Sequence, residues 1–387
     1  MTPSSKGPPQ RRALTRLRAE GSSPEAIDRL LSANRVPLVE GRGCTFLYRG
    51  QADAVAVEHG VVGIEAPLPM RRLRGTDLWY ASIELPRSAR VEYRLLVRHG
   101  DSVESILDPL NARWMAGPVS TMSVLEAEGY QTPWWALTNP AAVPGDLSEL
   151  RFPSRALRRE AHVTVYAPAR MRNHDRLPLL VLHDGGDFLN HASMCAVLDN
   201  LMDARLVADC VVAFTHPGDR LREYGASAAH SRFLTAELVP LLESRLPLRA
   251  EPAGRALAGA SFGGIASLTA AVRAPGFYGG LLLQSPSFLF TLVGRGHTGG
   301  PVFDPVVRFV NSVRADHRRV VGRAFVSYGA FERSAHRILA MVDTLEHMAD
   351  DVRVVQSLDG HTWTGWRDRM LDGLSWLFPG DARFVYP

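Results

Sequence analysis

Small residues surround one serine in the stretch 257–265. Gly259, Ser261 and Gly263 form the pattern G-x-S-x-G, which is typical of a sharp strand-to-helix turn that exposes a serine nucleophile. Such a turn needs small neighbours, because larger side chains would collide with the adjacent strand and helix. The N–H groups that open the following helix favour negative charge beside the serine. A plain glycine-rich turn is the alternative, so the rest of the chain must supply the other catalytic groups.

An acid and a histidine follow this serine in the order Ser…Asp/Glu…His, which suits acyl transfer on an α/β-hydrolase sheet. His361 comes just after the strand predicted at 352–357, where it can act as a general base. Glu332 follows the strand predicted at 323–328 and can accept a hydrogen bond from the imidazole. Three other carboxylates lie near in sequence and are alternatives to Glu332, namely Asp343, Glu346 and Asp359.

Two backbone N–H groups are needed to stabilise the oxyanion of such a reaction. We expect one from Phe262, the residue after the serine. The other is expected from the loop 183–188, which follows the apolar run 177–182 and contains two adjacent glycines. Gly186 is the predicted donor in this loop, and Gly185 is the alternative.

Strand-like and helix-like segments alternate from residue 147 to the end of the chain. The apolar runs 177–182, 210–214 and 280–284 are typical of buried parallel strands. Residues 231–246 carry apolar side chains at helical spacing. The region 147–387 is therefore predicted to be an α/β-hydrolase domain, a doubly wound and mostly parallel sheet with helices on both faces.

The N-terminal part of the chain has a different pattern. Short alternating runs between residues 43 and 117 predict a small antiparallel β-sandwich. Residues 118–146 are irregular and rich in Pro and Trp, so they are predicted to be a linker. Residues 1–42 are predicted to be a flexible tail followed by short helices, one of them starting with a cap at Ser23 and a proline at the next position.

The composition is that of a soluble globular protein, with 46% hydrophobic and 22% charged residues. The net charge of +4 comes without a long Lys/Arg run, which argues against a nucleic-acid partner. The cysteines Cys44, Cys195 and Cys210 are scattered and form no C-x-x-C, so neither a metal site nor a disulfide framework is expected. The polar N-terminus and the lack of a long apolar run predict a cytoplasmic protein without a membrane partner. No cofactor is expected, and the oligomeric state stays open.

Four segments resemble the enterochelin esterase family, namely the loop 183–188, the stretch 220–224, the serine turn and the stretch 359–367. In the N-terminal half, Asp108-Pro109-Leu110-Asn111 also resembles this family, in which an immunoglobulin-like sandwich precedes an esterase-D-type hydrolase domain. Asp359 stands where the family often has Gly. The resemblance covers roughly residues 43–378. It implies a serine esterase that hydrolyses a catecholate siderophore such as enterobactin for intracellular iron release.

Two other functions are kept as alternatives. The arrangement is also similar to that of some feruloyl and acetyl-sugar esterases, so a general or feruloyl-type carboxylesterase acting on another ester is one of them. The other is a non-catalytic binding protein built on a hydrolase fold, which the complete set of predicted catalytic residues disfavours.

An anionic, iron-loaded substrate would need basic contacts. We expect these from Arg113, Arg220 and Arg222, with Phe188 as an aromatic contact beside the oxyanion loop. For Arg220, a structural ion pair with Glu223 is the preferred interpretation, and the substrate contact is the other.

Three further features concern the surroundings of the serine. Trp363 and Trp366 are predicted to pack in the core and not against substrate. The glycine-rich segment 287–300 is predicted to be a mobile lid.

Overall fold

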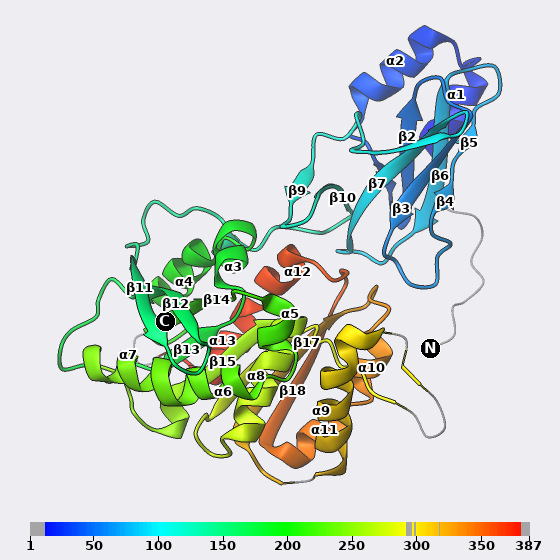
Figure 1. Cartoon of the computed structure of the whole chain (residues 1–387). Coiled ribbons are helices and arrows are strands. Elements are labelled where there is room, and N and C mark those ends of the chain that lie inside the picture. Colours follow the sequence, from blue (N-terminus) through cyan, green and yellow to red (C-terminus); the bar gives the residue numbers. More distant parts are fainter. Residues whose placement is uncertain (1–11, 292–295, 298, 317, 381–387) are drawn as a thin grey trace. The chain divides into compact units, whose positions relative to one another are not determined.

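The computed structural model describes residues 12–291, 296–297, 299–316 and 318–380 (Figure 1). It divides into two compact units, which are described separately. The first unit consists of Met1–Gln131, Ala330–Arg333 and Leu358–Thr362. The second unit consists of Thr132–Gly329, Ser334–Ser357 and Trp363–Pro387. Two short loops from the C-terminal half of the chain therefore group with the N-terminal unit.

The first unit contains two antiparallel sheets, as the alternating sequence pattern predicts. In β7 (Arg90–His99) every second side chain is buried, so one face of the strand faces the core. Phe46 and Tyr93, one from each sheet, pack edge to face in this core, with their ring centroids 4.7 Å apart. One sheet has the order β1 (Leu38–Glu40), β2 (Gly43–Arg49), β6 (Leu78–Glu84), β5 (Arg71–Arg72). The other has the order β4 (Leu68–Pro69), β3 (Ala54–His59), β7, β10 (Thr121–Glu126), β9 (Trp114–Ala116), with β8 (Ser102–Ile106) also paired to β7.

Two short helices precede the sandwich. The helix α2 (Pro24–Ala33) begins at Ser23, whose side chain accepts a hydrogen bond from the Ala26 N–H. Apolar side chains of α1 (Arg12–Ala19) and α2 form a small cluster with Leu47 of β2. The expected tail before α1 falls on residues outside the described part of the chain.

The boundary between the units differs from the predicted linker at 118–146. Its first part is the strand β10, which pairs with β7 and β9 in the sandwich. Its last part includes Trp135, which packs on a core of the second unit. The strand was missed because its run is short and Val124 and Leu125 are both buried, so the segment does not alternate.

The second unit is built on an eight-stranded sheet, which is mixed at one edge and parallel over the rest, as predicted (Figure 1). The two edge strands β11 (Asp146–Ser154) and β12 (Arg159–Ala167) are antiparallel, and β12 also pairs antiparallel with β14. All the other neighbouring pairs in this sheet are parallel. In sheet order the remaining strands are β14 (Val211–His216), β13 (Leu179–Leu182), β15 (Arg255–Ala260), β16 (Gly280–Gln284), β17 (Val321–Gly329) and β18 (Ala349–Ser357).

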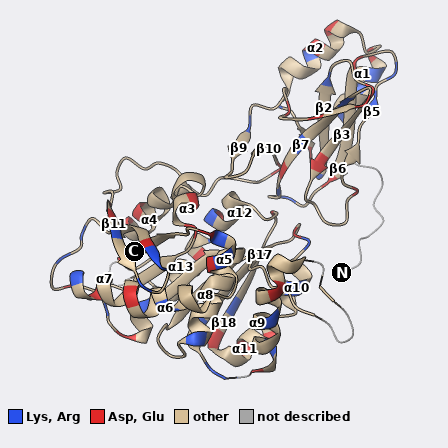
Figure 2. Ribbon diagram, in the orientation of Figure 1, with Lys and Arg blue, Asp and Glu red and all other residues tan. Residues whose placement is uncertain are grey.

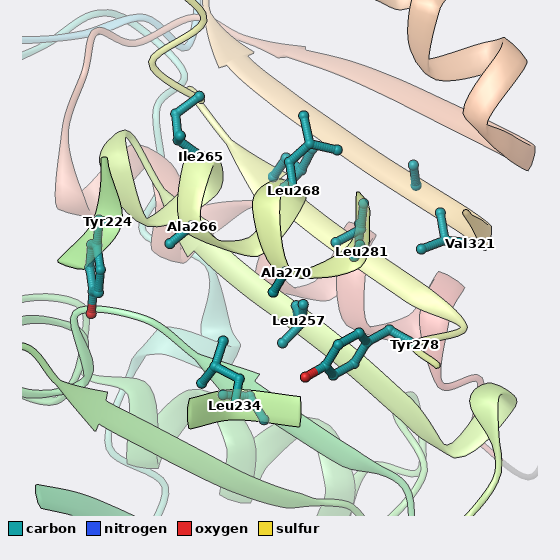
Figure 3. Packing of buried hydrophobic residues seen from close by; sticks show 14 of the residues in the cluster. Tyr224, Leu234, Leu257, Ile265, Ala266, Leu268, Ala270, Tyr278, Leu281 and Val321 are labelled. Atoms are coloured by element: carbon teal, nitrogen blue, oxygen red, sulfur yellow. The ribbon is translucent and has the colours of Figure 1, made fainter. Parts of the chain in front are cut away.

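Helices cover both faces of this sheet, and each face has its own apolar core. Figure 3 shows the larger core, in which α8 (Phe262–Arg273) packs Leu268 and Ala270 beside Leu257 and Leu281 of the strands. On the same side lie α6 (Ala228–Arg232), a π-helical stretch (Phe233–Leu238), α7 (Val239–Arg245), α9 (Asp304–Ala315) and α11 (Val342–Met348). The opposite core receives α3 (Gly185–His191), α4 (Met194–Asp203) and α13 (Met370–Leu377).

The short helices α5 (Arg220–Tyr224), α10 (Ala335–Leu339) and α12 (Trp363–Asp368) complete this unit. Basic and acidic residues are interspersed along the described elements (Figure 2). Among the described helices, none is long and apolar enough to cross a bilayer.

Candidate active site

The serine turn joins β15 to α8. Ser261 has φ 55° and ψ −118°, a backbone conformation that residues other than glycine rarely adopt and that marks a strained, functional turn. A Cβ atom on Gly259 would lie 2.4 Å from the carbonyl carbon and oxygen of Gly263, so only glycine fits there. A Cβ atom on Gly263 would lie 3.0 Å from the Cβ of His183. The requirement for small neighbours, predicted from the sequence, therefore has a steric cause.

Ser261 is held by β16 and the loop that follows it, and contacts a second serine in that loop. Its N–H donates to the Gln284 carbonyl at 2.9 Å, and its carbonyl accepts from the Ser287 N–H at 3.0 Å. The two hydroxyl oxygens Ser261 Oγ and Ser287 Oγ are 3.0 Å apart. Sequence reasoning placed Ser287 in a lid and missed it as a partner of the nucleophile. The only signal was its position just after the strand that neighbours β15.

The predicted oxyanion donors lie at the first turns of two helices. Phe262 is the first residue of α8, and Gly186 is the second residue of α3. First-turn N–H groups have no acceptor within their own helix, so they can bind a developing negative charge. Because β13 and β15 are parallel neighbours, α3 and α8 begin at the same edge of the sheet. A Cβ on Gly185 would lie 2.4 Å from the Cβ of Phe214, so this glycine allows the close approach of α3 to β14.

An ion pair fixes the loop that carries Gly186. The guanidinium of Arg220 binds the Asp184 carboxylate through two hydrogen bonds of 2.7 Å. Burial disfavours its charged form, but the Asp184 carboxylate outweighs this and raises the pKa of Arg220. The Asp184 N–H donates to the Tyr224 hydroxyl at 3.1 Å, and Asp184 itself adopts φ 56°. The loop is therefore held at three points around Asp184.

The expected ion pair between Arg220 and Glu223 is wrong. Glu223 accepts two hydrogen bonds of 2.8 Å from Arg159. Arg220 and Glu223 lie one turn apart on α5 but bind different partners, because the buried Asp184 carboxylate accepts two hydrogen bonds from Arg220.

Two buried histidines lie beneath the serine turn. His183 is fully buried, and its Nδ1 lies 2.9 Å from the Ala258 carbonyl, so that nitrogen carries the proton. Its Nε2 lies 3.0 Å from Nε2 of His230 and accepts from it. Burial lowers the pKa of His183 to about 4 and lowers the pKa of His230 well below its usual range. Both rings are neutral at pH 7 and act as a structural support.

The predicted acid and base are brought together. His361 Nδ1 lies 3.0 Å from Glu332 Oε2. The Glu332 side chain is 1% exposed and the His361 side chain 43% exposed, so the acid is buried while the imidazole reaches solvent. Both residues belong to the first unit, whereas Ser261 belongs to the second. The loops that carry them leave β17 and β18, which run parallel to β15, and therefore start from the edge of the sheet where Ser261 lies.

The remaining residues predicted near the substrate lie partly in the core and partly on the surface. Phe188 is fully buried and packs edge to face on Trp363, with the ring centroids 5.1 Å apart, so its predicted role as a substrate contact is wrong. Its side chain points into the core because it lies on the inner side of α3. Arg113, in the first unit, is 43% exposed and pairs with Glu126 at 3.2 Å. Trp366 is buried and donates to Ser285 Oγ at 2.9 Å, as expected for core packing.

The predicted lid at 287–300 falls partly outside the described residues, which exclude 292–295 and 298. Phe288 and Leu289 at its start are buried, and His297 pairs with Asp304 at 2.9 Å. In the described part of the chain, no group of three or more His, Cys, Asp or Glu side chains is placed to hold a metal ion. The cysteines Cys44, Cys195 and Cys210 are all free thiols.

Two family models match the chain. Residues 154–377 match the family described as "Putative esterase", and residues 43–135 match "Enterochelin esterase, N-terminal". The first match alone covers more than half of the chain and contains all the elements of the serine turn. The second covers most of the sandwich and continues past β10.

Curated relatives match along most of their length. An iron(III) enterobactin esterase from Dickeya dadantii is 26% identical over 363 residues, which cover 81% of this chain and 80% of the relative. An iron(III) salmochelin esterase from Escherichia coli is 25% identical over 386 residues, covering 88% of this chain and 90% of the relative.

Solved structures share the fold. The enterobactin esterase from Shigella flexneri, crystallised in the presence of enterobactin, has a TM-score of 0.68 at 22% identity, covering 87% of this chain and 92% of that one. The ferric enterobactin esterase from Salmonella typhimurium has a TM-score of 0.69 at 21% identity, covering 87% and 93%. The serine turn, the paired Glu332 and His361, and the two family models lead to one assignment: this chain belongs to the enterochelin esterase family.

Proposed function

We propose that the protein is a serine esterase that hydrolyses ester bonds of a catecholate siderophore of the enterobactin type. The observation that carries this proposal is the strained Ser261 turn in a chain whose two halves match the esterase and the enterochelin esterase N-terminal family models. The relatives named after enterobactin and salmochelin support the choice of substrate class. The reaction would release iron in the cytoplasm.

The reaction begins with attack of Ser261 Oγ on the ester carbonyl carbon. His361 Nδ1 faces Glu332, so its Nε2 takes the serine proton, and the buried carboxylate stabilises the imidazolium that forms. The N–H groups of Phe262 and Gly186 stabilise the negative carbonyl oxygen of the tetrahedral intermediate.

The intermediate then loses its alcohol. The bond between the carbonyl carbon and the leaving oxygen breaks, and the imidazolium gives its proton to that oxygen. Water attacks the acyl-enzyme, its proton goes to His361, and the same proton returns to Ser261 as the acid leaves. Ser261, His361 and the attacking water together account for every proton in the cycle.

The substrate contacts rest on two arginines. Arg113 and Arg220 are both more than one third exposed and can face an anionic catecholate. Arg220 would do so while still bound to Asp184, because that carboxylate binds only its Nε and Nη2 and the side chain is 38% exposed.

The test is hydrolysis of ferric enterobactin followed by mass spectrometry, which detects the gain of one water for each bond cleaved. We expect cleavage by the native chain and none by Ser261→Ala. Ser375→Ala, in a serine whose hydroxyl donates to the Leu371 carbonyl within its own helix, is the matched control and should retain full activity. Feruloyl and p-nitrophenyl esters are run in parallel. Preference for either over ferric enterobactin would refute the substrate class while keeping the esterase mechanism.

A fluorophosphonate probe separates catalysis from simple binding. It should label the native chain and spare Ser261→Ala, because only an activated serine reacts with it. Absence of labelling in the native chain would favour a non-catalytic binding protein.

A further inference from the structure

The loops that carry Glu332 and His361 are attached to the β-sandwich. Residues 330–333 and 358–362 belong to the same compact unit as the sandwich strands. Each loop connects a strand of the hydrolase sheet to a helix of the second unit, β17 to α10 and β18 to α12, so its grouping with the sandwich calls for a physical cause.

Phe331 attaches the first loop. Its side chain is 9% exposed and is a member of the sandwich core that includes Val61 and Val91. Its carbonyl accepts a hydrogen bond from the Val62 N–H at 3.3 Å. Because Phe331 directly precedes Glu332, burying its ring in this core restricts where the acid can lie.

Arg90, at the start of β7, attaches the second loop. Its N–H donates to the Leu358 carbonyl at 2.9 Å. Its guanidinium, on a side chain that is 3% exposed, lies 3.6 Å from Asp359 Oδ2 and also binds Glu92 at 2.9 Å. Asp359 Oδ1 in turn accepts from the Gly360 N–H at 2.6 Å, which fixes the turn just before His361.

A further hydrogen bond joins the two loops. The Phe331 N–H donates to the Asp359 carbonyl at 3.1 Å. The residues that precede Glu332 and the turn that precedes His361 are thus tied to each other and to the same sandwich. The Arg90 and Asp359 side chains are 3% and 7% exposed, so this attachment is shielded from water, and burial raises the pKa of Asp359 to about 6 despite the nearby charge of Arg90.

We propose that Phe331 and the Arg90–Asp359 ion pair are positioning elements, through which the β-sandwich holds His361 and Glu332 in their catalytic geometry. This inference rests on the proposed function, because it assigns the sandwich a part in the chemistry of that same site. The sandwich then does more than carry substrate contacts. It fixes the general base, and loosening it slows the reaction without removing any group that touches substrate.

The test compares Arg90→Met with Arg87→Met. Arg87 lies just before β7 and Arg90 begins it, and each pairs with a glutamate. Arg87 differs in lying on the surface, with 67% of its side chain exposed. Arg90→Met should lower kcat by about 10- to 100-fold, the scale expected for a misplaced catalytic group, with KM within about twofold of native. Arg87→Met should leave both unchanged. Arg90→Lys, which keeps the charge, should lose less than Arg90→Met.

Phe331→Leu tests the apolar attachment with a milder change than truncation to alanine. It should lower kcat in the same way at unchanged KM. Native kcat in both Arg90→Met and Phe331→Leu would overturn the proposal.

A second measurement does not depend on turnover. The hydrogen-bonded Nδ1 proton of His361 should give a downfield NMR signal that His361→Gln removes. In a Ser261→Ala background, Arg90→Met should weaken or broaden this signal, and Arg87→Met should not. An unchanged signal refutes the positioning role, whereas failure to hydrolyse any ester, or hydrolysis that survives Ser261→Ala, refutes the proposed function alone.

Discussion

The imidazole of His361 and the carboxylate of Glu332 lie 3.0 Å apart, and the acid is almost completely buried while the base is almost half exposed. The carboxylate oxygen lies within hydrogen-bond distance of Nδ1 and thereby orients the ring.

Glu332→Gln keeps the shape of this contact but removes its charge. We expect kcat to fall by about 10³- to 10⁴-fold, because the amide cannot stabilise the imidazolium. Steady-state kinetics with any ester that the native chain cleaves measures this loss. Glu346→Gln, in an exposed residue of α11, is the control and should be neutral. A loss with Glu346→Gln and none with Glu332→Gln would contradict the assignment of the acid.

Arg220→Gln separates two roles of that residue. If Arg220 mainly holds the oxyanion loop, its loss leaves Asp184 buried without its partner. The free energy of unfolding should then fall by about 1–3 kcal/mol, and kcat should drop as Gly186 moves. A rise in KM at unchanged stability would instead show a pure substrate contact. The double variant Asp184→Asn/Arg220→Gln should recover part of the lost stability, because the unpaired charge is then absent.

Gly259→Ala tests the steric origin of the serine turn. The new methyl would lie 2.4 Å from the backbone of Gly263, which cannot move without displacing Ser261. We expect a loss of about 1–3 kcal/mol in unfolding free energy by urea titration, together with a collapse of activity. Gly60→Ala is the control, since its Cβ would meet no described atom within 4 Å. Native activity in Gly259→Ala would show that the turn tolerates a larger residue.

The buried histidines should make the fold sensitive to acid. His183 has a folded pKa of about 4 against an ordinary value of 6.5, so unfolding takes up a proton between these values. The stability that its neutral form provides is complete above pH 6.5 and is lost as the pH falls toward 4. At pH 5 this amounts to about 2 kcal/mol relative to pH 7.

The comparison is made with His183→Gln, which cannot titrate. Its unfolding free energy should fall less between pH 7 and pH 5 than that of the native chain, even if its absolute stability is lower. His174→Gln, in an exposed histidine, should follow the native curve. An identical pH dependence in His183→Gln and the native chain would contradict a lowered pKa at this site.

Much of the fold and of the candidate site was readable in the sequence, because the signals are local. Apolar runs and alternation define the two kinds of sheet, and G-x-S-x-G defines a turn whose steric demands fall on residues two positions away. The order of Ser261, Glu332 and His361 follows from parallel strands, whose carboxyl ends share one edge. The pairing of Glu332 with His361 could therefore be predicted from the order of the strands alone.

Other features were decided by tertiary structure, because they depend on partners distant in the sequence. Arg220 binds Asp184 and not its neighbour Glu223, since only the fold places that carboxylate in reach. Phe188 lies in the core and β10 joins the sandwich for the same reason. Nothing local in Phe331 or Arg90 indicates that they bind the loops of the acid and the base, because that contact joins residues more than 200 positions apart. The sequence determined which groups can do the chemistry, and only the packing of distant segments decided what holds them in place.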